Sequence, residues 1–100
     1  MLALKNVTGF DWDAGNDRKN ADKHDVSQTE AEQVFFNEPL IVSGDVAHSQ
    51  AEPRWHALGR TSENRLLHIT FTIRGNGVLI RVISARDVSR KERRIYETDA

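Results

Sequence analysis

Apolar and polar side chains alternate most regularly along residues 67–74. The apolar members of this alternation are Leu67, Ile69, Phe71 and Ile73. Successive side chains of a strand point to opposite faces, so the pattern predicts a half-buried β-strand. The Gly-Asn-Gly sequence of residues 75–77 supplies the positive φ angles that a tight hairpin turn requires. The next run, residues 78–86, is apolar on both faces, which favours an inner strand of the sheet.

A second alternation, over residues 54–60, predicts another strand of the same sheet. When these strands are aligned, one face of the sheet is apolar and suited to being covered by helices. The opposite face carries Arg54, His56, Arg60, His68, Thr70, Thr72, Arg74 and Arg81. Arg81 interrupts an apolar run, and a buried arginine without a partner is costly. We therefore expect Arg81 either to pair or to face a solvent-filled cleft.

Signals for helix ends and short strands complete the predicted arrangement. Residues 13–23 are expected to form a first helix, capped by an aspartate. Capping boxes at residues 27–30 and 89–92 each open a further helix. Residues 10–13 and 40–42 are expected to form short strands. The order predicts an α+β fold with two N-terminal helices, an antiparallel β-sheet and a short C-terminal helix.

Composition narrows the class of protein. A chain of 100 residues is expected to form one small domain over residues 1–100. No apolar run of about 18 residues is present, so we expect no membrane span, and cytoplasmic residence is the default. The absence of cysteine excludes a disulfide framework, thiolate chemistry and a zinc–cysteine site.

The net charge of −1 conceals an uneven charge distribution. Residues 1–50 carry four basic and nine acidic side chains, whereas residues 51–100 carry ten basic and six acidic ones. Nine of those ten are arginine, whose planar guanidinium binds two phosphate oxygens at once. The basic half is therefore suited to an anionic polymer such as RNA, although a solvated charged surface fits the composition equally well.

The basic face has the groups needed to cleave RNA without a metal ion. The 2′-hydroxyl must lose a proton, charge on phosphorus must be stabilised, and the leaving 5′-oxygen must gain a proton. Arginines can stabilise the charge, and a histidine or carboxylate can transfer the protons. The candidates for proton transfer are His24, His56, His68 and Glu52. No pair of histidines or carboxylates has metal-ligand spacing on one clear element, so we expect no metal cofactor.

Each of these candidates also has a purely structural interpretation. His56 and His68 lie in mid-strand, where packing or hydrogen bonding explains a histidine. Glu52 could simply pair with Arg54, and His24 at a helix end would favour the helix dipole. Two aromatic side chains could stack on bases, although core packing is the stronger reading for the first of them. These two are Trp12 and Tyr96.

Several motifs in order along the chain resemble the BrnT family, the toxin half of a type II toxin–antitoxin system. They are FDWD at 10–13, Asn20, Lys23-His24, Val26-Ser27, Ala31, VFFNEPL at 34–40, His48-Ser49, Glu52, Arg54-Trp55, Gly59-Arg60, RVISAR at 81–86, Arg90, Glu92, Arg93 and Tyr96. The resemblance extends over most of the chain. It implies a RelE-like ribonuclease fold and inhibition of translation by RNA cleavage.

The resemblance also implies partners. A BrnA-type antitoxin with a ribbon-helix-helix DNA-binding part would neutralise the toxin and repress the operon, so that DNA is contacted only through the antitoxin. RelE-like toxins often take an arginine and a tyrosine from the last strand and the helix after it. Arg90 and Tyr96 are similarly placed here, with Arg81 and Arg86 as rivals for the arginine.

The hypothesis from sequence is a metal-independent endoribonuclease toxin. Its scissile phosphate would be bound in a common hollow by three arginines, with Glu52 or His24 transferring protons. These arginines are Arg54, Arg60 and Arg81. The further RNA-binding residues would be Arg74, Arg86, Arg90 and Tyr96. The alternative is a decayed, non-catalytic toxin that acts as an antitoxin-binding module.

Overall fold

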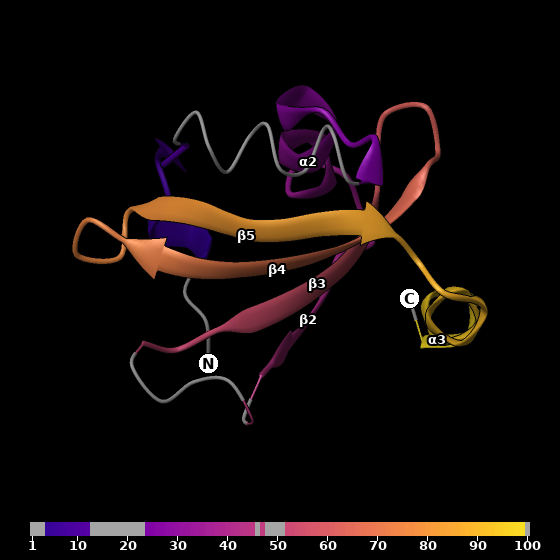
Figure 1. The fold of residues 1–100 in the computed structure, drawn as a ribbon. Coiled ribbons are helices and arrows are strands. Elements are labelled where there is room, and N and C mark those ends of the chain that lie inside the picture. Colours follow the sequence, from indigo (N-terminus) through magenta and orange to yellow (C-terminus); the bar gives the residue numbers. More distant parts are fainter. Residues whose placement is uncertain (1–3, 13–23, 46, 48–51, 100) are drawn as a thin grey trace.

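The computed structural model describes residues 4–12, 24–45, 47 and 52–99, which form a twisted five-stranded sheet with helices at its two sides (Figure 1). The strand order is β1-β5-β4-β3-β2. The elements are the 3₁₀-helix η1 (Leu4–Asn6), β1 (Gly9–Phe10), α2 (Gln28–Val34), β2 (Ile41–Gly44), β3 (Trp55–Arg60), β4 (Leu66–Arg74), β5 (Leu79–Asp87) and α3 (Arg90–Asp99).

The β4–β5 hairpin forms as the alternation predicts. Arg74 pairs with Leu79 across the turn, and the Gly-Asn-Gly residues 75–77 all adopt positive φ angles. β5 lies between β1 and β4, which confirms that it is an inner strand. A bulge at Thr70/Phe71 shifts the pairing by one residue, so side chains after it change face on β5.

Both predicted capping boxes are present. The Ser27 hydroxyl accepts a hydrogen bond from the Glu30 N–H, and the Glu30 carboxylate accepts one from the Ser27 N–H. Ser89 and Glu92 make the same pair of bonds at the start of α3. Neither of the two α-helices in the described part of the chain is long and apolar enough to cross a membrane.

Two features of the predicted arrangement need correction. The helix predicted over residues 13–23 lies outside the described residues, so α2 and α3 are the α-helices that the structure describes. The sheet is mixed rather than antiparallel, because β1 runs parallel to β5. A long connection containing α2 and three strands lies between β1 and β5, which permits parallel pairing, and alternation within a strand carries no information on its direction.

The core lies between the sheet and α2. Leu67, Ile69 and Phe71 of β4 are fully buried, as are Val82 and Ala85 of β5. From α2, Ala31 and Val34 complete this core. The apolar face that the sequence predicts is therefore the face that α2 covers.

Gly59 allows α2 to approach β3 closely. A Cβ at this position would lie 2.6 Å from Val34 Cγ1, closer than side chains pack. Val34 is fully buried and β-branched, so it has little freedom to move aside.

We expect Gly59→Ala to lower the free energy of unfolding by about 1–3 kcal/mol through overpacking. Gly44→Ala is the matched control, since a Cβ at Gly44 meets no atom within 4 Å. Urea unfolding of both variants measures the difference. Equal stability of the two variants would contradict this account of the α2–β3 contact.

Candidate active site

The register of β3 and β4 brings two histidines together on the sheet face opposite α2. His56 pairs with Thr70, and Leu58 pairs with His68, so the two histidines are diagonal neighbours on one face. Their ring centroids lie 4.7 Å apart. Arg86 of β5 pairs with His68 on the same face. We refer to His56, His68, Thr70 and Arg86 as the histidine strip.

Each ring nitrogen of His56 has a polar partner. Its Nε2 lies 3.1 Å from Asp45 Oδ2, and its Nδ1 lies 3.1 Å from Thr70 Oγ1. The buried Asp45 carboxylate can only accept, so Nε2 carries the hydrogen and Nδ1 is the basic nitrogen of the neutral ring. The His56 side chain is 32% exposed. This is the arrangement of an oriented and accessible general base.

His68 is more deeply buried than His56. Burial lowers its pKa, and the Arg86 cation lowers it further, whereas the Glu92 carboxylate opposes both effects. Its Nε2 lies 3.8 Å from Glu92 Oε2, and its Nδ1 makes no hydrogen bond to the described residues. These surroundings favour the neutral form of the His68 ring. His68 therefore adds no positive charge beside His56.

Glu92 connects α3 to the histidine strip. It caps its own helix and accepts two hydrogen bonds from Arg86, at 2.8 and 2.9 Å. The hydrogen bonds from Arg86 are the main reason that the pKa of Glu92 falls to about 2. α3 lies beyond the end of β5 (Figure 1), and the hydrogen bonds between Arg86 and Glu92 join the two elements.

The three arginines expected to converge are not in one place. Arg81 pairs with Thr72 in the sheet, and Arg54 precedes Trp55, whose partner is Phe71. Both therefore lie at the hairpin end of β4. Arg60 pairs with Leu66 at the opposite end, about 20 Å away at the rise of a strand. No common hollow can hold all three side chains.

Arg81 was expected either to pair or to face a solvent-filled cleft, and the structure shows that it pairs with a carboxylate. Its Nη1 lies 3.6 Å from Asp11 Oδ2, just after β1. Glu52 likewise has a basic partner, because its Oε1 accepts a hydrogen bond of 3.1 Å from Arg74 Nη2. Glu52 and Arg74 thus form an ion pair near the hairpin end of the sheet.

His24 lies on the other side of the sheet from the histidine strip. Its carbonyl accepts a hydrogen bond from Arg65, whose guanidinium also binds Glu30 of α2 and Asp87. The two predicted proton-transfer residues, His24 and Glu52, are therefore not close together. His24 also does not lie on the basic face.

The predicted RNA-binding residues at the C-terminus have different surroundings. Tyr96 is 7% exposed, and its hydroxyl donates to the Pro39 carbonyl at 2.6 Å. It anchors α3 and offers no ring face for stacking, and its burial raises its pKa. Arg90 is exposed at the start of α3. Trp12 is half-buried and donates to Glu32, which agrees with packing.

Sequence reasoning missed the carboxylate partners of the two histidines. The capping box at residues 89–92 predicts only a helix-capping role for Glu92, and no pattern predicts a role for Asp45. The alternation already placed His56 and His68 on one face, and that was the available signal. The carboxylate partners depend on where the residue after β2 and the first turn of α3 come to lie.

Comparison with known proteins identifies the family. The family described as "Ribonuclease toxin, BrnT, of type II toxin-antitoxin system" matches residues 12–92. This chain belongs to the BrnT family of ribonuclease toxins. The resemblance seen in the sequence motifs is therefore confirmed, and membership of a family of type II ribonuclease toxins implies a cognate antitoxin and an RNA substrate.

A crystal structure of the Brucella abortus ribonuclease toxin BrnT has a similar fold. The TM-score is 0.63 at 21% sequence identity, and the match covers 84% of this chain and 100% of that chain. The similarity shows that the two proteins share a fold and assigns no role to individual side chains. No curated protein matches this chain.

We expect Glu92→Gln to destabilise this BrnT-family protein by about 2 kcal/mol at pH 7, because Arg86 loses a charged partner. The pKa of Glu92 is lowered from about 4.5 to about 2 on folding, so its contribution is complete above pH 4.5 and disappears as the pH falls towards 2. The stability difference from wild type should shrink over that window.

Urea unfolding between pH 7 and pH 2 measures this difference. Glu97→Gln, at an exposed position of the same helix, serves as the control and should match wild type throughout. A difference for Glu92→Gln that does not change with pH would show that the ion pair with Arg86 adds no stability.

Proposed function

We propose that this ribonuclease toxin is an endoribonuclease that cleaves RNA without a metal ion, with His56 as its proton-transfer group. One observation carries the proposal: His56 is held by a buried carboxylate, is partly exposed and contacts a second histidine. Acid–base catalysis requires such an oriented, titratable group within reach of substrate.

The proposed reaction begins with the 2′-hydroxyl of RNA replacing the Thr70 hydroxyl at His56 Nδ1. His56 takes the proton, and the 2′-oxygen attacks phosphorus and forms a bond there. The Asp45 carboxylate stabilises the imidazolium, as a carboxylate beside a catalytic histidine does. The bond to the 5′-oxygen then breaks, and that oxygen takes its proton from the imidazolium or from water. The products are a 2′,3′-cyclic phosphate and a free 5′-hydroxyl.

Arginines on both sides of the histidine strip support binding of the RNA backbone. Arg54 and Arg81 lie at its hairpin end, two strands and so about 10 Å apart. Arg86 lies at its other end, and its side chain is 37% exposed beside Glu92. A phosphate can share these guanidinium groups with their carboxylates, because each has five N–H donors. Arg81 and Arg54 are best placed to stabilise charge on the scissile phosphate.

The remaining residues of the hypothesis have weaker positions. Arg60, Arg74 and Arg90 are exposed and suited to contacts with outlying phosphates. Glu52 stays a candidate for proton transfer, although its carboxylate is already held by Arg74. His24 is separated from the basic face by the sheet. Tyr96 keeps a structural role, because it is buried.

The cellular role follows from this chemistry. Cleavage of RNA would inhibit translation in the cytoplasm. We propose a BrnA-type antitoxin with a ribbon-helix-helix part as the neutralising partner, so that the toxin meets operator DNA only through it. Belonging to a type II toxin family supports a protein antitoxin.

The second candidate function is a non-catalytic, antitoxin-binding module. The carboxylate partners of Arg74, Arg81 and Arg86 favour it, because they already neutralise part of the basic face. In this case the purified protein would bind its antitoxin but leave RNA intact.

Cleavage of a defined RNA by the purified protein tests the proposal. We expect cleavage to persist in EDTA and to leave 2′,3′-cyclic phosphate ends, detected by mass spectrometry. A substrate with a 2′-deoxy nucleotide at the scissile position is the matched control and should resist cleavage. Loss of cleavage in EDTA would overturn the metal-free chemistry. Intact RNA under all conditions would favour the antitoxin-binding module.

A further inference from the structure

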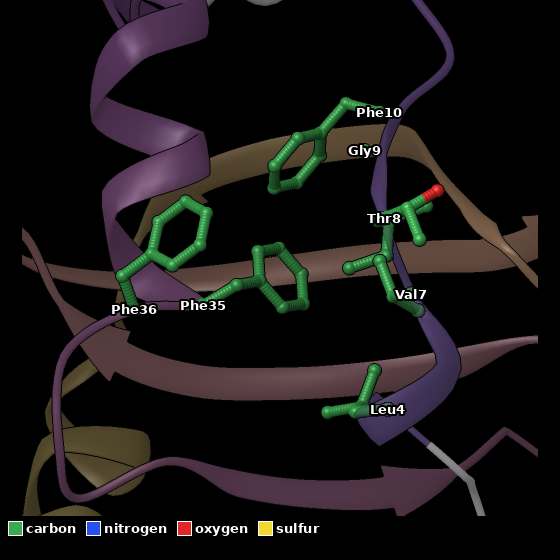
Figure 2. Close-up of a pocket in the computed structure, with 8 residues that line it drawn as sticks. Leu4, Val7, Thr8, Gly9, Phe10, Phe35 and Phe36 are labelled. Atoms are coloured by element: carbon green, nitrogen blue, oxygen red, sulfur yellow. The ribbon is translucent and has the colours of Figure 1, made fainter.

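The most exposed large apolar side chain in the described part of the chain borders a pocket. Phe36, just beyond α2, is 76% exposed. Beside it is a cavity of about 170 Å³ (Figure 2). The cavity is lined by Leu4, Val7, Thr8, Gly9, Phe10, Phe35, Phe36 and Ile80. An exposed aromatic ring at the mouth of an apolar cavity is typical of a binding surface.

The walls of this pocket are held by aromatic contacts. Phe10 packs edge-to-face on Phe35 at 5.8 Å and on Phe36 at 6.1 Å. Phe35 packs in turn on the fully buried Phe71 at 5.1 Å. Figure 2 shows Phe35 and Phe36, which follow α2, facing the segment of Leu4 to Phe10 across the pocket. The pocket is therefore preformed, which lowers the entropy that a ligand would lose on binding.

The size and lining of the pocket suit one apolar side chain. A cavity of about 150 Å³ in an apolar core holds a benzene ring, so this pocket has room for one phenyl or leucyl group. Its lining carries no charged residue. The pocket therefore fits the apolar anchor of a protein segment, and it offers no charged group to bind phosphate.

The charges around the pocket indicate what flanks such an anchor. Residues 24–38, which supply Phe35 and Phe36, contain four carboxylates and neither lysine nor arginine. Arg65 pairs with Glu30, and Trp12 donates to Glu32. Glu38 is exposed two residues beyond Phe36. Residues 4–10, which supply most of the remaining lining, contain one basic residue, Lys5, so the two segments together carry a net charge of −3, from four carboxylates and one lysine. This net negative charge favours a basic partner segment.

We propose that this pocket receives a large apolar side chain from a lysine- or arginine-rich segment of the cognate antitoxin. The inference rests on the proposed neutralisation by an antitoxin, and it identifies the surface that the antitoxin would contact. Ile80 reaches the pocket from the α2 face of the sheet, whereas the histidine strip lies on the opposite face. The pocket would therefore bind the apolar anchor of the antitoxin on the face of the sheet opposite the candidate catalytic groups.

Phe36→Asp tests this surface, because it removes an aromatic wall of the pocket at an exposed position without disturbing the core. The binding partner is the purified product of the antitoxin gene beside the toxin gene. Calorimetry should show at least about tenfold weaker binding, in the range expected for loss of a central anchor. Ile95→Asp, at the other exposed large apolar side chain, is the matched control and should bind as wild type does.

RNA cleavage and thermal unfolding of the free variants complete the test. Phe36→Asp should keep its Tm and cleave RNA within about twofold of wild type, because Phe36 is a surface residue far from the histidine strip. Unchanged antitoxin binding by Phe36→Asp would overturn the proposal, as would equal losses in both variants. Unchanged antitoxin binding with dissociation of a wild-type homodimer would instead assign the pocket to a second copy of the chain.

Binding is measured without RNA, so the result does not depend on catalysis. If the wild type left RNA intact, the ribonuclease mechanism would fail while the binding comparison still decided the role of the pocket.

Discussion

The register between β3 and β4 determines which side chains lie together on the basic face of the sheet. Side chains change face at each residue, so a slip of β3 by one residue would turn His56 towards α2, away from His68, and would turn Ala57 and Gly59 away from α2. The α2 side prevents this slip: Trp55 stacks on Phe71 with ring centroids 6.0 Å apart, and Gly59 accommodates Val34. Packing on one face of the sheet therefore positions the candidate catalytic groups on the other.

Carboxylates then fix the orientation of the groups that the register has placed. Asp45 follows β2 and reaches His56, and Glu92 begins α3 and holds Arg86 beside His68. On the α2 side, the Arg65 guanidinium binds both Asp87 and Glu30. The hydrogen bonds to these carboxylates raise the pKa of Arg65 above the usual range for arginine. These four carboxylates thus act as partners of basic side chains. A modest net charge is therefore compatible with a face that binds an anionic polymer.

The strands and capped helices could be predicted because their signals are local. Alternation located β3 and β4, a run that is apolar on both faces located β5, and each serine–glutamate pair located the start of a helix. The parallel direction of β1 could not be predicted, since it depends on where a distant segment enters the sheet. The expected meeting of Arg54, Arg60 and Arg81 was wrong for a related reason. Alternation gives the face of a side chain, whereas its position along the sheet follows from the register.

The candidate site was only partly within reach of the sequence. His56 and His68 were recognised as proton-transfer candidates but valued below Glu52 and His24. Their importance became visible only when the sheet placed their rings in contact and supplied Asp45. Tyr96 shows the converse: the family likeness predicted a place in the RNA-binding cleft, whereas its side chain is buried and its hydroxyl donates a hydrogen bond to the Pro39 carbonyl.

Single-turnover cleavage of a short RNA by His56→Ala tests the central claim most directly. Loss of a general base predicts a rate lower by about 10²–10⁴-fold, with an unchanged far-ultraviolet circular dichroism spectrum. His24→Ala, which removes a histidine on the other side of the sheet, should cleave at the wild-type rate. Full activity in His56→Ala, or its loss in His24→Ala, would contradict the account.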